Sequence, residues 1–350
     1  MHPYVLAITL GDPAGIGPEI TARTLAEAPA AGRARGVAVG DAIALRRAVD
    51  ACGLDVDVRE IGSFATPPQE GAIDVVDTGA LGGRPVEWGA VDERAGRAAV
   101  DAIEVATEAA MKGEVAAVVT GPINKEAIWA AGAKHLGHTE MLGELTGVTQ
   151  QDTMFVVGGA DAGHDLKIFF TTRHMSLAKA IAQLSTERIL ESIESSLRAL
   201  VVFGVERPRF AVAALNPHGG ENGAFGDEEL TMIGPACELA RGRGHDVRGP
   251  IPADSVFHQG IQGRHDAVLS HFHDQGHIAA KTYDFNGTIS ITVGLPILRT
   301  SVDHGTAFDI AGQGVADHAT MRAAYLAAVR YAPRTDAIRR AYGRSVGPMV

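Results

Sequence analysis

The chain has 350 residues, of which 46% are hydrophobic and 21% are charged, a composition typical of a globular protein with two domains or one large domain. The formal net charge of -11 argues against nucleic-acid and anionic-membrane partners, because neutralising phosphates requires clustered Lys and Arg. Cys52 and Cys237 lie far apart with no CxxC spacing, and no apolar stretch approaches the ~20 residues of a membrane span. We therefore expect a soluble, cytoplasmic protein with no nucleic-acid or membrane partner.

Strands and helices alternate through the first half of the chain. An apolar run at Tyr4–Leu10 predicts a first strand, and a Gly- and Pro-rich turn at Gly11–Glu19 leads into a helix. The turn matches neither GxGxxG nor GxxxxGKS/T, so a tight turn and a contact with an anion are both open. The other elements expected here are a strand at 37–41, a helix through 43–49, a strand near 56–61, an irregular connection at 62–90, a helix at 91–112 and a strand at 115–120.

The alternation continues through the second half, without a low-complexity linker or a short repeat. We expect strands at 153–158, 167–172, 209–215 and 267–269, helices at 185–203 and 320–331, and a solvated basic tail after the last helix. Strand, helix and strand in succession indicate a parallel sheet with right-handed crossovers. The predicted fold class is therefore α/β.

Three histidines follow strand ends in this pattern. His174, His218 and His273 each stand just beyond an apolar strand, at the edge where open parallel sheets bind ligands. Neutral imidazole is a common metal ligand, so the three predict a catalytic divalent-metal site with positions open for substrate. Spacing alone leaves open that they are surface or hydrogen-bonded core histidines. If the strand at 267–269 continues, His271 and His273 project from the same face.

Arg299 follows a run of apolar residues, where an unpaired guanidinium would be costly. A carboxylate or phosphate held in a fixed position would satisfy its planar fork of donors. An internal ion pair with Asp303 would satisfy it equally well. The sequence does not choose between a ligand and a structural ion pair at this position.

The motifs together resemble one family, the 4-hydroxythreonine-4-phosphate dehydrogenases of pyridoxal phosphate biosynthesis with their phospho-threonate and phospho-erythronate dehydrogenase relatives. They span nearly the whole chain in the order of the family. The matching stretches are GDPAGIGPEI at 11–20, VTGPINKEA at 119–127, GHTE at 137–140, NPHGGENGAFG at 216–226, PADSVF at 252–257, HDQG at 273–276 and GLPILRTSVDHGTAFDIAG at 294–312.

The resemblance implies two α/β/α domains similar to isocitrate and isopropylmalate dehydrogenases, with a cleft between them. We expect one domain from 1–125 with 300–350 and a second from 126–299. It also implies a homodimer with a shared active site, NAD or NADP as cofactor, and one divalent metal (zinc, magnesium or cobalt) per subunit.

Site residues carry over from the family motifs. The metal ligands are His174, His218 and His273, the same three that strand ends indicate. Substrate contacts are expected at His138, Thr139, Lys281, Ser290 and Arg299. Catalytic roles are expected at Lys281, Asp254 and Asp274, where the two aspartates either act directly or, more simply, orient the metal histidines. Cofactor contacts are expected at Gly294, Leu295, Asp303 and His304.

The expected reaction oxidises a secondary hydroxyl beside a carboxylate-bearing carbon, passes hydride to NAD or NADP and releases carbon dioxide. Two departures from the family leave the substrate open: Ser290 replaces an Asn that contacts substrate, and Arg173 stands in the typical Thr-Thr-His. The candidates are 4-phosphohydroxythreonine, 4-phosphothreonate, 4-phosphoerythronate and dihydrodiol acids. The rivals are a metal-dependent aldolase, decarboxylase or phosphatase without nicotinamide, and a phosphometabolite-binding protein with a structural zinc.

Overall fold

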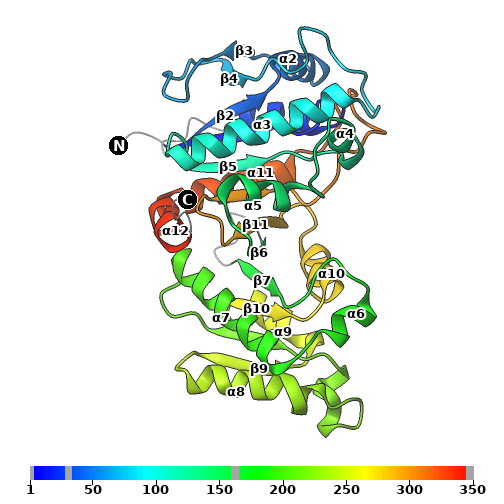
Figure 1. The fold of residues 1–350 in the computed structure, drawn as a ribbon, viewed down its shortest axis with the longest axis vertical. Helices are drawn as coiled ribbons and strands as arrows, with labels where there is room; N and C mark the ends of the chain where they lie inside the picture. The colour runs from blue at the N-terminus through cyan, green and yellow to red at the C-terminus, as the bar shows by residue number, and fades with distance from the viewer. Residues whose placement is uncertain (1–3, 28–33, 159–164, 344–350) are drawn as a thin grey trace, which may run out of the picture. The chain divides into compact units, whose positions relative to one another are not determined.

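A computed structural model describes residues 4–27, 34–158 and 165–343 of the chain. The chain divides into two units, Met1–Asp152 with Ile289–Val350 and Thr153–Thr288. Each unit contains a mainly parallel sheet with helices on both faces (Figure 1). The α/β class predicted from the sequence is confirmed.

The first unit holds both ends of the chain. Its strands are β1 (Tyr4–Thr9), β2 (Ala34–Gly40), β3 (Asp57–Glu60), β4 (Ala72–Asp77), β5 (Ala117–Thr120), β11 (Ile289–Val293) and β12 (Arg299–Ser301). Its helices are α1 (Gly17–Glu27), α2 (Ala42–Ala51), α3 (Glu93–Lys112), α4 (Lys125–Ala130), α5 (His138–Thr146), α11 (Ala319–Tyr331), the 3-10 turn η3 (Ala332–Arg334) and α12 (Thr335–Tyr342).

The strands of the first unit lie in the order β3-β4-β2-β1-β5-β12-β11, with β11 antiparallel to β12 and the other pairs parallel. Side chains alternate between the two faces of the sheet, as strand geometry requires. Val37 and Val39 pack with α3 on one face, and Ala38 packs with α1 and α2 on the other. Both faces are therefore core, which explains the near-continuous apolar runs of these strands.

The division into units differs from the predicted boundaries, which placed 126–152 and 289–299 with the second domain. α4 and α5 pack against α3, and β12 pairs with β5 while β11 pairs with β12. These contacts join both segments to the first unit. Composition changes at neither boundary, so packing partners set the division and sequence patterns did not reveal it.

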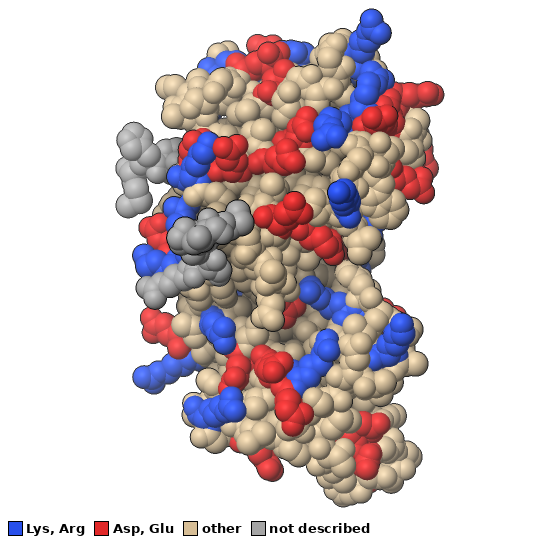
Figure 2. Space-filling model, in the orientation of Figure 1, with Lys and Arg blue, Asp and Glu red and all other residues tan. Residues whose placement is uncertain are grey.

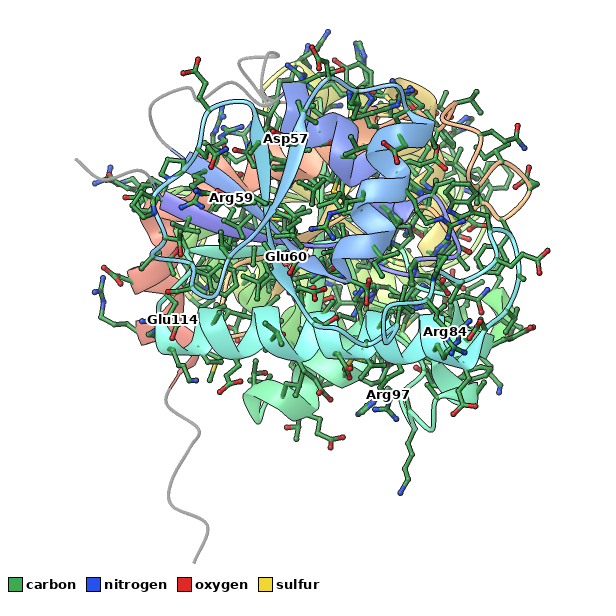
Figure 3. All side chains as sticks on the ribbon, turned by 90° about the horizontal axis from the view of Figure 1, so that it is seen from above. Asp57, Arg59, Glu60, Arg84, Arg97 and Glu114 are labelled. Carbon is green, nitrogen blue, oxygen red and sulfur yellow. The ribbon has the colours of Figure 1, made fainter. Side chains whose placement is uncertain are left out.

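Two segments of the first unit differ from the sequence expectation. The irregular connection expected at 62–90 contains β4, which lies between β2 and the charged edge strand β3. Its Ile73 and Val75 are buried in the core on one face of the sheet. Asp57, Arg59 and Glu60 lie along β3 (Figure 3), a charge pattern that discourages pairing with another sheet edge. The tail expected to be solvated forms α12, with Ile338 1% exposed; its residues 344–350 lie outside the described residues.

The turn after β1 is a closed structural turn. Its backbone N–H groups donate within the protein: Ala14 to Asp12 Oδ1 at 2.8 Å, and Ile16 to the Thr306 carbonyl at 3.0 Å. Gly11 has φ +69, and a Cβ there would meet the Pro122 carbonyl oxygen at 2.2 Å. Of the two alternatives left open by the sequence, the tight turn accounts for these residues.

The second unit carries the histidine motifs. Its strands are β6 (Asp152–Val157), β7 (Leu166–Phe170), β8 (Phe210–Ala213), β9 (Val247–Ile251) and β10 (Ala267–Ser270). Its helical segments are α6 (Leu177–Ala182), α7 (Thr186–Val202), the 3-10 segment η1 (Pro217–Asn222), the π-helical turn η2 (Glu229–Ile233), α8 (Gly234–Gly242), α9 (Ala253–Ile261) and α10 (His273–Tyr283).

The strands of the second unit lie in the order β6-β7-β10-β8-β9, with only the β6–β7 pair antiparallel among the described strands. Ile168 and Phe170 pack with α9 and α10 on one face. Phe169 points to the opposite face, where its ring lies 6.2 Å from that of Phe210 and where α7 contacts β7. This unit too is an α/β/α sandwich.

Among the described residues, no helix is both long and apolar enough to cross a bilayer. On the face shown in Figure 2, Lys and Arg side chains are interspersed with Asp and Glu. The described residues of this face therefore form no continuous basic surface of the kind that nucleic acids require.

Candidate active site

The three histidines predicted as metal ligands follow neighbouring strands of the second unit. His174 follows β7, His273 follows β10 and His218 follows β8. These strands are parallel and adjacent in the order β7-β10-β8, so their C-terminal ends share one edge of the sheet. The topology therefore places the three histidine-bearing segments at the edge where α/β proteins bind ligands.

Two of these histidines line one cavity. The rings of His174 and His273 lie 5.6 Å apart, centroid to centroid. The cavity has a volume of about 280 Å³ and is also lined by Arg173 and Asp274. Arg173, the residue that departs from the family's Thr-Thr-His, thus adds a positive group beside the expected metal ligands.

Carboxylates contact the Nδ1 atoms of two histidines. Asp274 Oδ1 lies 2.6 Å from His273 Nδ1, and Glu221 Oε1 lies 3.2 Å from His218 Nδ1. An imidazole that donates Nδ1–H to a carboxylate presents Nε2 as a lone pair, which is how metal-ligating histidines are commonly oriented. The contact fits an orienting role for Asp274, whereas Glu221 was not singled out from the sequence.

The segment that carries His218 has an unusual backbone. His218, Glu221 and Asn222 have φ values of 55, 45 and 55°, in a region that non-glycine residues rarely occupy. Glu229, which is 4% exposed, accepts hydrogen bonds from the backbone N–H of Leu215 and of Asn216, both at 2.7 Å, and from Asn216 Nδ2 at 2.9 Å.

Burial tends to raise the pKa of Glu229, but the hydrogen bonds from Asn216 and Leu215 outweigh it, and the pKa is lowered. The carboxylate thus anchors the start of the strained segment in its charged form. Strain of this kind persists where the surrounding contacts hold it, and it gathers at functional sites.

The three imidazole side chains are suitable ligands for a divalent metal, but the described residues do not form a complete metal site. No group of three or more His, Cys, Asp or Glu side chains among them is placed to hold one ion. His174 and His273 line the same cavity, while His218 is not among its lining residues. The histidines are therefore suitable ligands on one sheet edge and not a preformed cage.

His271 ties the three strand ends together. β10 ends at Ser270, so His271 and His273 do not share a strand face as they would if the strand continued. The His271 ring is 1% exposed and its Nε2–H donates to the Ala213 carbonyl, at the end of β8, at 2.7 Å. Thr172, just after β7, donates to the His271 carbonyl at 2.7 Å. Burial lowers the pKa of His271 to about 4, so the ring is neutral.

Two other predicted residues of this unit lie on nearby helices. Lys281 is two helical turns beyond His273 on α10, on the same face, and its Nζ lies 5.4 Å from the centre of the Phe285 ring. Asp254 is in the first turn of α9 and is exposed.

Arg299, a predicted substrate residue of the first unit, is buried among hydroxyl side chains. Its guanidinium is 6% exposed, and its partners are hydroxyls: Thr120 Oγ1 accepts from Nε at 3.1 Å and from Nη2 at 2.7 Å. Thr292 Oγ1 accepts from Nη1 at 3.0 Å, and Ser301 Oγ accepts from Nη2 at 2.8 Å. Asp303 is not among the partners of Arg299 in the described chain, so the internal ion pair does not form.

Burial lowers the pKa of Arg299 to about 10, and the group stays charged at neutral pH. His138, the first residue of α5, has a buried Nε2 with no hydrogen-bond partner among the described residues. Burial, and then the charge of Arg299, hold the pKa of His138 well below its usual value. A buried cation with neutral partners and a buried ring nitrogen without one both call for a ligand.

The residues expected to contact a cofactor have mixed surroundings. Leu295 is 1% exposed and belongs to the apolar core, so only its backbone could touch a ligand. Gly294 has φ +96, and a Cβ there would lie 3.0 Å from the Gln150 carbonyl oxygen, so packing already requires glycine. Asp303 and His304 are half-buried just after β12. For Gly294 and Leu295, chain packing explains the residue types without a cofactor.

Several site residues escaped the sequence analysis. The hydroxyl residues that bind Arg299 resemble ordinary strand residues in the sequence; they are Thr120, Thr292 and Ser301. The one signal that could have identified them was the run of hydroxyl residues beside Arg299. Glu229 lies outside the quoted motifs and gave no signal. Glu221 stood inside one of these motifs, three residues after His218, but only the fold shows which ring atom it contacts.

The chain is similar to known proteins over nearly its whole length. The pattern of the family described as "Pyridoxal phosphate biosynthetic protein PdxA" matches residues 33–328. A Cutibacterium acnes protein named "Putative D-threonate 4-phosphate dehydrogenase" is 52% identical, over 98% of each chain. A Symbiobacterium thermophilum protein of the same name is 47% identical, over 94% of this chain and 96% of its own.

Solved structures give the same picture. The 4-hydroxythreonine-4-phosphate dehydrogenase of Klebsiella pneumoniae is 41% identical with a TM-score of 0.83, over 94% of this chain and 99% of its own. A terephthalate 1,2-cis-dihydrodiol dehydrogenase of Burkholderia xenovorans is 30% identical with a TM-score of 0.59, over 91% of this chain and 95% of its own. Similarity is thus higher to the phosphate-ester dehydrogenase than to the dihydrodiol enzyme.

Proposed function

Since the chain belongs to the family of the pyridoxal phosphate biosynthetic protein PdxA, we propose that it is a nicotinamide-dependent dehydrogenase of a small phosphorylated hydroxy acid. The motif resemblance and the expectation of a dehydrogenase are thereby confirmed. The observation that carries the substrate class is the buried Arg299, held by hydroxyls alone beside the unpartnered His138 Nε2. Such a pair favours an anionic ligand with oxygen acceptors.

D-threonate 4-phosphate is our first candidate for the substrate. Relatives named for it are 52% and 47% identical, whereas the solved 4-hydroxythreonine-4-phosphate dehydrogenase is 41% identical. Ser290 supports this choice of substrate. It is 9% exposed, and its short hydroxyl replaces the amide that contacts substrate in the family. A dihydrodiol acid lacks the phosphate and is not favoured.

In the proposed reaction, the carbinol carbon next to the carboxylate-bearing carbon gives its hydride to the nicotinamide ring. The hydroxyl proton leaves to a base, for which Lys281 is our candidate. The resulting β-keto acid breaks its bond to the carboxylate, releases carbon dioxide and leaves an electron pair on carbon that then takes up a proton. Arg299, His138, Thr139 and Ser290 hold and orient the substrate during these steps.

The metal ligands in this proposal are His174, His218 and His273, with Asp274 and Glu221 orienting two of the rings. A divalent ion held by these histidines would supply Lewis-acid chemistry to the substrate. Imidazole ligands favour zinc or cobalt over magnesium. Asp254, exposed at the start of α9, remains a candidate orienting group.

NAD or NADP is proposed to lie along the 294–312 segment, with Asp303 and His304 as the contacting side chains. The active site is proposed to be shared in a cytoplasmic homodimer, as the family resemblance implies. Mixing two inactive variants, Arg299→Met and His273→Ala, would test sharing: recovered activity after subunit exchange supports it, and activity of a strictly monomeric protein contradicts it.

The test is a panel of phosphorylated hydroxy acids. D-threonate 4-phosphate, 4-phosphohydroxythreonine and 4-phosphoerythronate would be assayed by nicotinamide absorbance with NAD or NADP and added zinc, cobalt or magnesium. We expect the highest kcat/KM with D-threonate 4-phosphate and no turnover of unphosphorylated D-threonate. A clear preference for an unphosphorylated or dihydrodiol acid would contradict the proposal.

A further inference from the structure

Hydroxyl side chains form a row across the sheet of the first unit. Thr9 on β1 pairs with Thr120 on β5, Thr120 pairs with Ser301 on β12, and Ser301 pairs with Ser290 on β11. Residues paired in this way project from the same face of a sheet. All four are at most 9% exposed, which is uncommon for a row of polar groups.

Thr292 and Arg299 continue the row toward the middle of the sheet. They are direct partners across β11 and β12, and each stands two residues from a serine of the row, so they share its face. Thr120 also donates its hydroxyl to Ser301 Oγ at 2.9 Å. The hydroxyls are therefore bonded to one another as well as to the guanidinium.

These hydrogen bonds use most of the N–H donors of the Arg299 guanidinium. Of its five N–H groups, Nε–H, both on Nη2 and one on Nη1 point to hydroxyl oxygens. Among the described residues this leaves one Nη1–H without a protein acceptor. A neutral acceptor fixes the plane of the guanidinium but cancels none of its charge, whereas a carboxylate would have cancelled it.

We propose that Thr120, Thr292 and Ser301 are positioning residues that hold Arg299 as a pre-oriented, uncompensated receptor for one oxygen of an anionic substrate group. The inference rests on the proposed role of Arg299 in substrate binding and deepens it. Thr120 is central, because it accepts two of the four bonds and donates a third to Ser301. His138 Nε2 supplies a second contact for the same ligand.

The experiment compares matched threonine variants of the full chain. Thr120→Val keeps the shape but removes the hydroxyl, and Thr120→Ser keeps the hydroxyl. Thr107→Val is the control, because Thr107 is a buried threonine of α3 whose Oγ1 has no partner among the described residues. The readouts are the Kd of inorganic phosphate by ³¹P NMR titration, KM and kcat for D-threonate 4-phosphate, and the unfolding midpoint.

We expect Thr120→Val to weaken phosphate binding by about tenfold or more and to raise KM more than it lowers kcat, because bonds to a charged donor are lost. Thr120→Ser should restore binding to within about threefold, and Thr107→Val should leave it unchanged. If Thr120→Val does not fold, Ser301→Ala and Thr292→Val carry the same expectation with one bond lost each.

Phosphate binding by folded Thr120→Val, Ser301→Ala and Thr292→Val that equals binding by Thr107→Val would overturn the inference. So would a loss of binding in Thr120→Val that Thr120→Ser does not restore. Because phosphate binding is measured without turnover, its dependence on Thr120 would stand even if no phosphorylated hydroxy acid were oxidised. That second result would contradict only the proposed function.

Discussion

Acidification should destabilise the second unit through His271. The ring is buried and neutral with a pKa of about 4, whereas an unfolded chain gives histidine a pKa near ~6.5. Below this value the unfolded state binds a proton that the folded state does not. The folded state therefore loses stability as the pH falls from about 6.5 toward 4, and no such loss occurs above this window.

The magnitude follows from the two pKa values. Between about pH 7.5 and 5.5 the His271 contribution to the free energy of unfolding falls by about 1.3 kcal/mol, and the full shift corresponds to about 3 kcal/mol. His138 and His265 also have lowered pKa values, mainly because they are buried. A comparison with a variant is therefore needed to isolate the His271 share.

The assay is urea unfolding of wild type and of His271→Gln at both pH values. Gln can still donate to the Ala213 carbonyl but does not titrate. The free energy of unfolding of His271→Gln should therefore fall less between the two pH values than that of wild type, by about 1 kcal/mol. His258→Gln, at an exposed position of α9, is the control and should follow wild type. Equal pH dependence in wild type and His271→Gln would refute the reasoning.

Three further results are expected. Glu229→Gln replaces the charge-assisted hydrogen bonds from Leu215 and Asn216 by neutral ones. We expect it to destabilise the protein by about 2 kcal/mol at pH 7, measured by urea unfolding, and to lower the affinity for metal. Unchanged stability would contradict the anchoring role. Ser290→Asn should shift the kcat/KM ratio toward 4-phosphohydroxythreonine by about tenfold, and a change below about twofold would be evidence against Ser290 as a selector. His218→Ala should lose bound metal, by elemental analysis, with an unchanged circular dichroism spectrum; a variant that retains metal and activity would remove His218 from the ligand set.

Chain order and hydrophobic pattern were enough to predict the α/β class and the strand-end positions of His174, His218 and His273. β4 was missed because its short apolar stretch around Ile73 and Val75 lies in a region rich in Gly and Pro. The domain boundaries were not visible either, since β11 and β12 find their partners in the first unit and nothing in local composition marks that choice.

Side-chain roles were harder to predict than positions. His271 and His273 are two residues apart, yet one is buried and bonded to the Ala213 carbonyl while the other lines a cavity. The two environments differ because β10 ends at Ser270, before either histidine. Arg299 was correctly singled out as costly, but the hydroxyls that hold it come from three strands, and register cannot be read from spacing.

The most direct test of the proposed function measures three products in one reaction. Purified enzyme, stripped of metal and then reloaded with zinc or cobalt, would be given D-threonate 4-phosphate and NAD or NADP, and reduced nicotinamide, carbon dioxide and free phosphate would be followed together. We expect reduced nicotinamide and carbon dioxide in equal amounts, no free phosphate, and no reaction before metal is restored. Carbon dioxide or phosphate released without nicotinamide reduction would identify a decarboxylase or phosphatase and contradict the dehydrogenase.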